Sequence, residues 1–310
     1  MKKVFITRRL PFIAQEILQK KFKVSCSDKN EPCPIDKLED IVTDYDAVLT
    51  TISEKFDKNI LKQKKNLKVI SNYAIGLDNI DVKYAQSVGI TVYNTPDVVT
   101  NSTADLTFAI LLSLIRKISF AHNFVKKDKW KAWDPELFLG EELNGKVFGI
   151  LGFGNIGQAV ARRALSFGLN IIFYDILKKD VNSLDNQVVK SVGLNELIET
   201  SDYLSIHLPL TDETTGLINK NIINKMQKKP IILNMARGDI VITEDLLEAL
   251  KSGKIRGAGL DVTSPEPLSG NHPLCYLDNC IIVPHIGTAT KECRINMARL
   301  AAQNIINHFS

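Results

Sequence analysis

The second half of the sequence contains three side chains that could bind an anion and move a proton: Arg237, Glu266 and His285. Arg237 follows the apolar run Ile231 to Asn234, and its guanidinium fork suits a bidentate grip on a carboxylate. His285 closes the run Ile281 to Pro284, and an imidazole can pass a proton to or from a substrate oxygen near neutral pH. Glu266 could hydrogen-bond that imidazole, favour its protonated form and fix its orientation. Each residue alone could be structural, but together they predict acid–base chemistry on a substrate that carries a carboxylate.

A glycine-rich motif near the middle of the chain has the sequence Gly152-Phe153-Gly154-Asn155-Ile156-Gly157. It follows the predicted strand Val147 to Leu151 and opens the predicted helix Gln158 to Phe167. In that position the first glycine permits a tight turn, the second lets the backbone approach a pyrophosphate, and the third allows close helix packing. The helix N-terminus adds N–H donors and positive potential. A purely structural turn is the alternative, but the strand, loop and helix order predicts that this motif binds a dinucleotide.

An acidic residue, Asp175, ends the next predicted strand, eighteen residues after Gly157. Its carboxylate could bind the ribose hydroxyls of a dinucleotide and would repel a 2′-phosphate. We therefore expect NAD as the cofactor, with NADH preferred. Lys178 and Lys179 could weaken this preference and leave NADPH possible, and a solvated Asp at a strand end is the alternative interpretation of Asp175.

Short β-branched runs alternate with helical patterns along the chain, which is typical of βαβ units around a parallel sheet. The rhythm occurs twice, so we predict an α/β fold with two lobes. The first set of predicted strands comprises Val4 to Thr7, Ala47 to Thr51, Leu67 to Asn72 and Ile90 to Asn94. The second comprises Val147 to Leu151, Asn170 to Tyr174, Tyr203 to His207, Ile231 to Asn234, Gly257 to Asp261 and Ile281 to Pro284.

The chain is expected to cross between the lobes twice. The first crossing lies at the turn Thr95-Pro96-Asp97, after which Asn101-Ser102-Thr103 could cap a long helix that begins near Ala104. The segment Thr288 to Phe309 is predicted to be one amphipathic helix with no strand after it, so it must pack on a face of an existing sheet, and we expect it to return to the first lobe. We predict two domains. A discontinuous substrate-binding domain comprises residues 1–98 and 287–310, and an NAD-binding domain comprises residues 99–286.

Composition excludes several classes of protein. The chain has 310 residues, 45% of them hydrophobic, and a formal net charge of +4, which indicates neither disorder nor a nucleic-acid partner. The first apolar run is too short for a signal peptide, and Leu106 to Ile115 is too short to span a membrane. The five cysteines form no CxxC pair, so we expect no metal site, no disulfide framework and a cytoplasmic location.

The order of these motifs resembles the D-isomer-specific 2-hydroxyacid dehydrogenases. The resemblance extends over most of the chain and includes Asn234-x-Ala-Arg237-Gly, Gly259-Leu-Asp261, Glu266-Pro and Pro284-His285-Ile-Gly287. It implies two Rossmann-like or flavodoxin-like domains with an active-site cleft between them. It also implies that Arg237 binds the substrate carboxylate and keto oxygen, that His285 is the acid/base, and that Glu266 is its partner.

The resemblance also implies the remaining contacts. The backbone N–H groups of Ile75 and Gly76 would hold the substrate carboxylate, and Asp261 would contact the nicotinamide. His207 is expected near the cofactor. Further cofactor contacts are expected from Asn155, Ile156, Met235, Ala236, His285 and Gly287.

Within the family, the segment from Trp130 to Gly140 looks most like that of glyoxylate and hydroxypyruvate reductases. In that branch the segment reaches the active site of a neighbouring subunit, so Trp133 would narrow the pocket against bulky 2-oxo acids. Trp133 packing only at a dimer interface is the alternative. The resemblance also implies a homodimer, and exposing so apolar a helix as Ala104 to Ile118 would otherwise be unfavourable.

Three rival functions share parts of this pattern. A phosphoglycerate dehydrogenase would carry the same catalytic set, and the present chain would then be of the short type that lacks a regulatory domain. A formate dehydrogenase would have Gln at the position of Glu266. An NAD-responsive corepressor would be a binding protein, and it would be expected to carry additional terminal segments for its partners.

Overall fold

The computed structural model describes residues 1–27, 29–179 and 189–310, which form an α/β protein with two parallel sheets. The fold class predicted from the alternating pattern is therefore confirmed. The chain divides into two compact units. Unit 1 comprises Met1–Val99 with Thr288–Ser310, and unit 2 comprises Thr100–Gly287, so that each break falls one residue after its predicted position.

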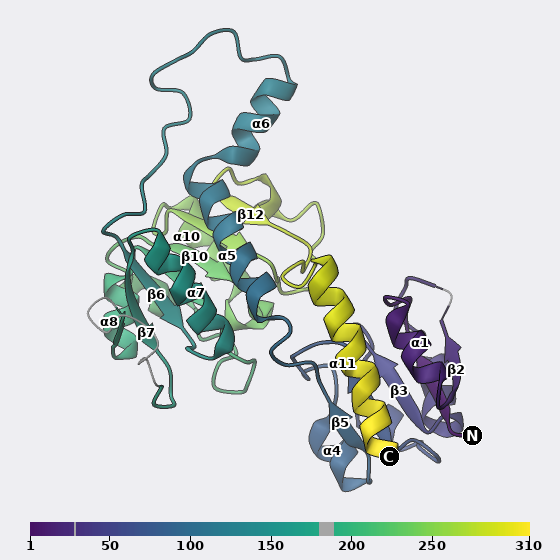
Figure 1. Ribbon diagram of the computed structural model, residues 1–310. Coiled ribbons are helices and arrows are strands. Elements are labelled where there is room, and N and C mark those ends of the chain that lie inside the picture. The colour runs from purple at the N-terminus through teal and green to yellow at the C-terminus, as the bar shows by residue number, and fades with distance from the viewer. Residues whose placement is uncertain (28, 180–188) are drawn as a thin grey trace. The chain divides into compact units, whose positions relative to one another are not determined.

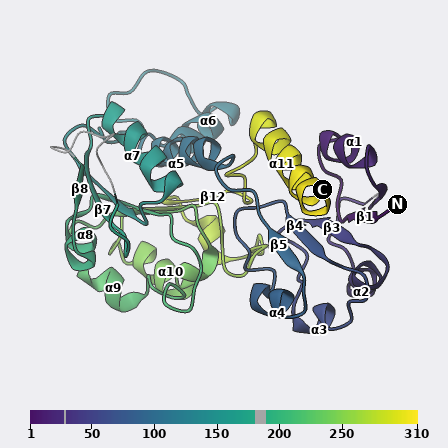
Figure 2. The ribbon, with the colours of Figure 1, turned by 60° about the horizontal axis from the view of Figure 1, so that its bottom comes forward.

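Unit 1 contains a five-stranded parallel sheet with the order β2-β1-β3-β4-β5. Helices α1 and α11 cover one face, and α2, α3 and α4 cover the other (Figure 2). The strands are β1 (Lys3–Ile6), β2 (Lys23–Cys26), β3 (Ala47–Thr50), β4 (Val69–Asn72) and β5 (Thr91–Tyr93). The helices are α1 (Ile13–Gln19), α2 (Ile35–Asp44), α3 (Lys58–Leu61), α4 (Val82–Ser87) and α11 (Lys291–Phe309).

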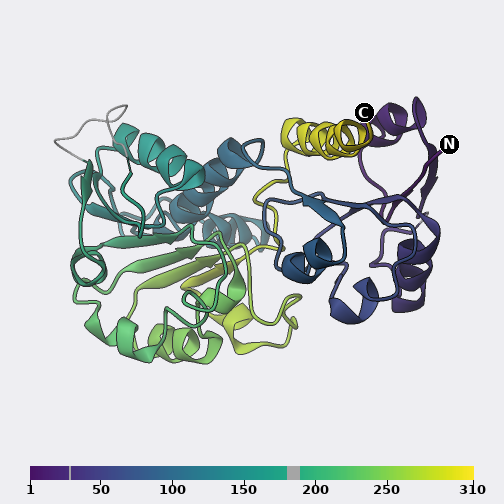
Figure 3. The same cartoon turned by 90° about the horizontal axis from the view of Figure 1, so that it is seen from below.

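Unit 2 contains a seven-stranded parallel sheet with the order β12-β11-β10-β9-β6-β7-β8. Helices α5 and α7 cover one face and α8, α9 and α10 the other (Figure 3). The strands are β6 (Val147–Leu151), β7 (Asn170–Tyr174), β8 (Val189–Ser191), β9 (Tyr203–Ile206), β10 (Ile231–Asn234), β11 (Gly257–Leu260) and β12 (Cys280–Ile282). The helices are α5 (Thr100–Ile115), α6 (Ile118–Lys126), α7 (Asn155–Ser166), α8 (Leu194–Thr200), α9 (Lys220–Lys225), α10 (Thr243–Lys251) and two short 3-10 turns, Gly238–Ile240 and Pro273–Tyr276.

The central strands of unit 2 are apolar on both faces because both faces are covered. All four residues of β10 are buried, with Leu233 packed in the core on the α5 side and Ile232 in the core on the α10 side. The chain leaves β6 in one direction to β7 and later returns on its other side at β9. The strand order therefore reverses at the carboxyl end of β6, which is where open parallel sheets bind their ligands.

The predicted start of the long helix is wrong. Helix α5 begins at Thr100, so Ser102 and Thr103 lie inside its first turn instead of capping it. Their hydroxyls bond the carbonyl of Gly287 instead, at 2.7 and 3.5 Å. The helix also ends at Ile115, three residues earlier than predicted, and one of its faces is buried against unit 2 itself. Much of its apolar character is thus explained by burial within this chain, and its packing across a dimer interface stays a prediction.

Two other helices start at different residues from those predicted. Helix α7 begins at Asn155, so its first turn includes the second half of the glycine motif. Helix α11 begins at Lys291, because the Thr290 hydroxyl accepts a hydrogen bond from the Cys293 N–H and caps it. It packs on α1 and β4 in unit 1.

An arm of residues 116–139 extends from the body of unit 2 (Figure 1). Helix α6 in this arm has no buried residue. The arm is closed at its base, where Glu141 N–H donates to the carbonyl of Ile115 and Gly140 packs against it with no room for a side chain. Trp133, on the arm, is 81% exposed.

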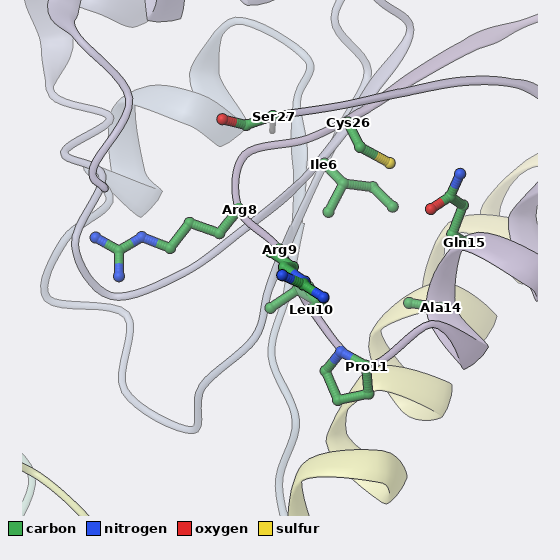
Figure 4. Close-up of a pocket in the computed structure, with 9 residues that line it drawn as sticks. All are labelled: Ile6, Arg8, Arg9, Leu10, Pro11, Ala14, Gln15, Cys26 and Ser27. Carbon is green, nitrogen blue, oxygen red and sulfur yellow. The ribbon is translucent and has the colours of Figure 1, made fainter. Parts of the chain in front are cut away.

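A pocket of about 350 Å³ lies in unit 1 where β1 and β2 end (Figure 4). Its lining includes Arg8, Arg9, Gln15 and Ser27. Arg8 lies 3.6 Å from the buried Glu54, so the charge of Arg8 is already paired with a carboxylate.

In the part of the chain that the structure describes, no helix is long and apolar enough to cross a membrane, and no cluster of side chains could hold a metal ion.

Candidate active site

The turn after β10 presents Arg237. The side chain of Asn234 shapes this turn, because it accepts a hydrogen bond from the Ala236 N–H and donates one to the Arg237 carbonyl. Gly238 then lets a second loop approach closely, since a side chain there would lie 2.0 Å from the carbonyl oxygen of Thr263. The loop that starts at Thr263 leads to Glu266. The turn and the loop are therefore packed against each other, with Arg237 on one and Glu266 on the other.

His285 and Glu266 form a hydrogen-bonded pair with 2.7 Å between Nδ1 and Oε1. Burial disfavours the charged form of Glu266, but the hydrogen bond and charge of His285, the Thr263 N–H and the charge of Arg237 outweigh it. The pKa of Glu266 is consequently below its usual value, and the carboxylate stays charged at neutral pH. Because Glu266 occupies Nδ1, the Nε2 atom of His285 remains as the ring position for proton exchange with a ligand.

Asp261 holds the turn that carries His285. Its carboxylate accepts hydrogen bonds from the N–H groups of Ile286, at 2.6 Å, and Gly287, at 2.8 Å. Burial raises the pKa of Asp261, although these two N–H groups and the charge of His285 oppose the rise. Asp261 is only 2% exposed. Its observed contacts are with the backbone next to His285, and its contact with a nicotinamide stays a prediction.

The glycine motif has the form that a dinucleotide requires. Gly152 has φ of +95°, and a side chain on it would lie 2.7 Å from the carbonyl oxygen of His207. A side chain on Gly157 would lie 2.3 Å from the Gly152 carbonyl oxygen, so these two glycines are needed for packing. A Cβ added at Gly154 would meet nothing within 4 Å. The space in front of Gly154, at the start of helix α7, is therefore open to a phosphate.

Asp175 lies beside this motif. One carboxylate oxygen accepts the Phe153 N–H and the other accepts the Leu177 N–H, each at 2.8 Å. Lys179 lies 3.6 Å from the same carboxylate. Each oxygen retains a lone pair for a hydroxyl ligand.

His207 follows β9, and its carbonyl faces Gly152. Its Nε2 pairs with the Ser205 hydroxyl at 2.8 Å, whereas its buried Nδ1 has no hydrogen-bond partner among the described residues. Burial lowers the pKa of His207 to about 3, so the ring is neutral. A buried ring nitrogen left without a partner near the glycine motif fits a site that a polar ligand completes.

Comparison with known proteins identifies the fold and its chemistry. The sequence profile of the D-isomer specific 2-hydroxyacid dehydrogenase NAD binding domain matches residues 108–287. The chain belongs to this family. It is 44% identical to a glyoxylate reductase of Pyrococcus furiosus, over 98% of this chain and 91% of that protein, and 42% identical to one from Thermococcus litoralis, over 98% and 92%.

Solved structures agree with this assignment. The TT0316 protein of Thermus thermophilus superimposes with a TM-score of 0.92 at 39% identity, over 98% of this chain and 96% of that one. A glyoxylate reductase from Paecilomyes thermophila gives a TM-score of 0.89 at 30% identity, over 100% and 95%. The protein is thus an oxidoreductase that acts on CH–OH groups, and unit 2 of this dehydrogenase is its NAD-binding domain.

The remaining predicted site residues of the dehydrogenase lie in different places. Ile75 and Gly76 belong to unit 1, in the loop after β4, and Trp133 lies on the arm. Met235 and Ala236 follow β10, but their side chains are buried in the two cores of unit 2. Any contact that Met235 or Ala236 makes with a cofactor must therefore come from its backbone.

The sequence analysis placed Asn234 in a motif and Ser102 in a possible cap, but it did not predict that their side chains hold the catalytic turns. Asn234 shapes the Arg237 turn, and Ser102 binds the Gly287 carbonyl from a distance of 185 residues in sequence. A polar residue at the end of an apolar strand is the one signal that could have found Asn234. Nothing in the sequence pairs Ser102 with residue 287, because hydroxyl donors are common near helix starts.

Proposed function

We propose that this dehydrogenase reduces small 2-oxo acids, glyoxylate and hydroxypyruvate, to the corresponding D-2-hydroxy acids. The observation that carries the proposal is the 2.7 Å pair of His285 and Glu266, with the charge of Arg237 acting on the same carboxylate. The glyoxylate reductases among the relatives support the choice of substrate. A nicotinamide supplies the hydride that reaches the carbonyl carbon.

Each proposed catalytic residue has a separate role in the reaction at the carbonyl group. Protonated His285 donates the proton at Nε2 to that oxygen as the hydride arrives at the carbon. Glu266 holds the ring in place and stabilises its charged form. Arg237 binds the substrate carboxylate and stabilises the negative charge that develops on the oxygen in the transition state.

Each unit carries part of the proposed set of ligand contacts. In unit 2, residues 152–157 would bind the pyrophosphate, and the residues after β10, together with His207, Asp261 and Gly287, would line the rest of the cofactor site. In unit 1, the N–H groups of Ile75 and Gly76 would bind the substrate carboxylate. Trp133 of a neighbouring subunit would limit the size of the acid.

Asp175 supports NADH as the preferred cofactor. Its carboxylate accepts two backbone N–H groups and keeps capacity for ribose hydroxyls, whereas a 2′-phosphate would face its negative charge. Lys179 offsets part of that charge from 3.6 Å. NADPH should therefore be accepted less well, without being rejected outright.

A steady-state assay of the purified protein tests both points. We expect the highest kcat/KM with glyoxylate and hydroxypyruvate. We also expect about tenfold higher values with NADH than with NADPH, because NADPH lacks the ribose hydroxyl that would bond the charged Asp175, and such a hydrogen bond is worth on the order of 1.5 kcal/mol. The panel should include pyruvate, a bulky 2-oxo acid and phosphohydroxypyruvate. Preference for phosphohydroxypyruvate would indicate a phosphoglycerate dehydrogenase instead. No turnover of any acid, together with tight NADH binding, would indicate a corepressor-like binding protein.

We also propose a homodimer that forms through the arm. Exposed apolar side chains gather there, including Ile118 and Val125, each 52% exposed, and Trp133. An apolar surface of this kind is more stable when a second copy covers it. Sedimentation velocity should give twice the 34.6 kDa mass of the chain, and Val125→Asp should shift the species toward the mass of one chain. A wild-type mass of one chain at micromolar concentration would rule the dimer out.

A further inference from the structure

In the loop that follows β4 in unit 1, three successive backbone carbonyl groups each accept a hydrogen bond. The carbonyl of residue 74 accepts the Thr95 N–H at 2.9 Å. The carbonyl of residue 75 accepts the side-chain amide of Asn94 at 2.8 Å, and that of residue 76 accepts the side-chain amide of Asn72 at 2.8 Å. The orientation of three consecutive peptide groups is therefore set by hydrogen bonds from outside the loop.

The three N–H groups of these peptides point the other way. In a planar trans peptide the C=O and N–H bonds are antiparallel. A hydrogen bond that orients the carbonyl therefore points the N–H of the same peptide away from the hydrogen-bond donor. The donors concerned are the N–H groups of Ile75, Gly76 and Leu77, and the structure gives none of them an acceptor among the described residues. Ile75 is exposed, and the next two residues are partly exposed. Successive backbone N–H groups left open in this way suit an anion.

The Asn72 amide can point only one way. Its nitrogen also lies 3.0 Å from the side-chain oxygen of Asn79. The nitrogen of Asn79 in turn donates to the carbonyls of Thr51 and Glu54, at 3.0 and 2.9 Å, so the Asn79 oxygen must be an acceptor. Both partners of the Asn72 nitrogen accept hydrogen bonds, and reversing either amide would set acceptor against acceptor. Asn72 and Asn79 are both buried, which holds this arrangement in place.

Asn94 is supported from the C-terminal helix. Its backbone carbonyl accepts the side-chain amide of Asn304 on α11, at 3.0 Å. The segment after β5 is thus held by a residue 210 positions later in the sequence. Helix α11 therefore positions the backbone of Asn94, whose side chain then bonds the loop.

We infer that Asn72 and Asn94 are positioning residues for the substrate. By holding two carbonyls they direct the N–H groups of Gly76 and Leu77, next to that of Ile75, toward the carboxylate of the 2-oxo acid. The inference rests on the proposed function and adds the residues that act through the backbone. Neither asparagine touches the substrate in this account.

The kinetic consequence is specific. The carboxylate of a 2-oxo acid carries the same charge before and during hydride transfer. A residue that orients the N–H donors to this carboxylate therefore stabilises the ground state and the transition state equally. Weakening that group should raise KM and leave kcat nearly unchanged. A group that acts on the developing oxyanion, such as Arg237, should instead lower kcat.

The test compares Asn94→Ala with Asn66→Ala. Asn66 is a matched control because its side-chain amide also donates to a carbonyl in unit 1, at 2.8 Å, but the carbonyl is that of Thr43 and not one of residues 74–76. In Asn94→Ala we expect KM for glyoxylate and the dissociation constant of oxamate, a planar carboxylate, to rise about tenfold. The kcat should stay within about twofold and the affinity for NADH should not change. Asn66→Ala should behave as the wild type in all four measurements.

Other results would overturn the inference. Unchanged KM and oxamate binding in Asn94→Ala would show that the hydrogen bond from Asn94 to the carbonyl of residue 75 is not needed for substrate binding. A fall in kcat at constant KM would show a role in the chemical step. Asn72→Ala should give the same pattern, but Asn94→Ala carries the test if removal of the buried amide prevents folding. If the wild type reduces no 2-oxo acid, the proposed function fails, while calorimetric titration of oxamate into the NADH complex of each variant still decides the role of Asn94.

Discussion

Replacement of His285 with alanine should lower kcat for reduction of glyoxylate by about 10²- to 10⁴-fold, the usual contribution of a positioned acid or base. The imidazole is the acid we place at the carbonyl oxygen, and its Nδ1 is already taken by Glu266 at 2.7 Å. Binding of NADH should change far less than kcat, because His285 is only one of several expected cofactor contacts and the glycine motif is intact in this variant. Stopped-flow or steady-state oxidation of NADH measures the loss, and fluorescence titration measures the affinity.

Two further variants make this result specific. His272 lies in the same unit and accepts the Leu274 N–H at 3.3 Å, so His272→Ala should keep wild-type kcat. Glu266→Gln keeps the shape of the side chain but removes the charge that favours the protonated imidazole. The pKa of Glu266 is below its usual value, so this charge is present throughout the neutral range. In Glu266→Gln kcat for reduction should therefore fall across the neutral range, because the neutral amide no longer stabilises the charged ring. Full activity of His285→Ala would show that another group donates the proton.

Replacement of Gly154 with alanine should weaken NADH binding about 100-fold without changing the melting temperature. A Cβ at this position meets no atom of the chain within 4 Å, so the folded protein tolerates it. The same Cβ would occupy the space in which the backbone approaches the pyrophosphate. Isothermal titration with NADH and a thermal melt of the apoprotein give the two quantities.

The control for this variant is Gly193→Ala. Gly193 is the N-cap of helix α8, as Gly154 is of α7, and a Cβ on it also meets nothing within 4 Å. It is not part of the glycine motif, so NADH affinity should stay at the wild-type value. Equal affinity of Gly154→Ala and Gly193→Ala for NADH would contradict the proposed pyrophosphate site. A large drop in the melting temperature of Gly154→Ala would mean that the position is needed for folding.

Much of the site could be predicted from the sequence because its signals are local. The glycine motif and Asp175 depend on a strand, a tight turn and a helix start within about thirty residues, where residue type and backbone conformation are directly coupled. Arg237 and His285 could be found because each follows an apolar run, and parallel strands place their carboxyl ends along one edge of the sheet. The alternating pattern was likewise sufficient for the α/β class.

The extent of helix α5 could not be predicted in the same way. Asn101, Ser102 and Thr103 have the composition of a cap, but the helix begins earlier and uses Ser102 to bind the Gly287 carbonyl. Cap preference is worth only about 1 kcal/mol, so a buried tertiary hydrogen bond can outweigh it. The apolar surface of α5 likewise predicts a dimer interface from sequence, whereas in the structure one face of the helix is buried within unit 2.

The sequence by itself determined which groups can do chemistry: an imidazole, a guanidinium, a glycine-rich turn and the carboxylates of Asp175, Asp261 and Glu266, all at or shortly after the ends of predicted strands. Only the tertiary structure decided how those groups are held. Asp261 fixes the turn after His285, Gly238 admits the loop that carries Glu266, and Asn72 and Asn94 orient the peptides of residues 74–77. These ties depend on contacts and hydrogen bonds set to within a few tenths of an ångström, and related hydrogen bonds join residues 185 and 210 positions apart, Ser102 with Gly287 and Asn304 with Asn94. Residue type and local spacing carry no record of such partners, which exist only once the sheets and helices have packed.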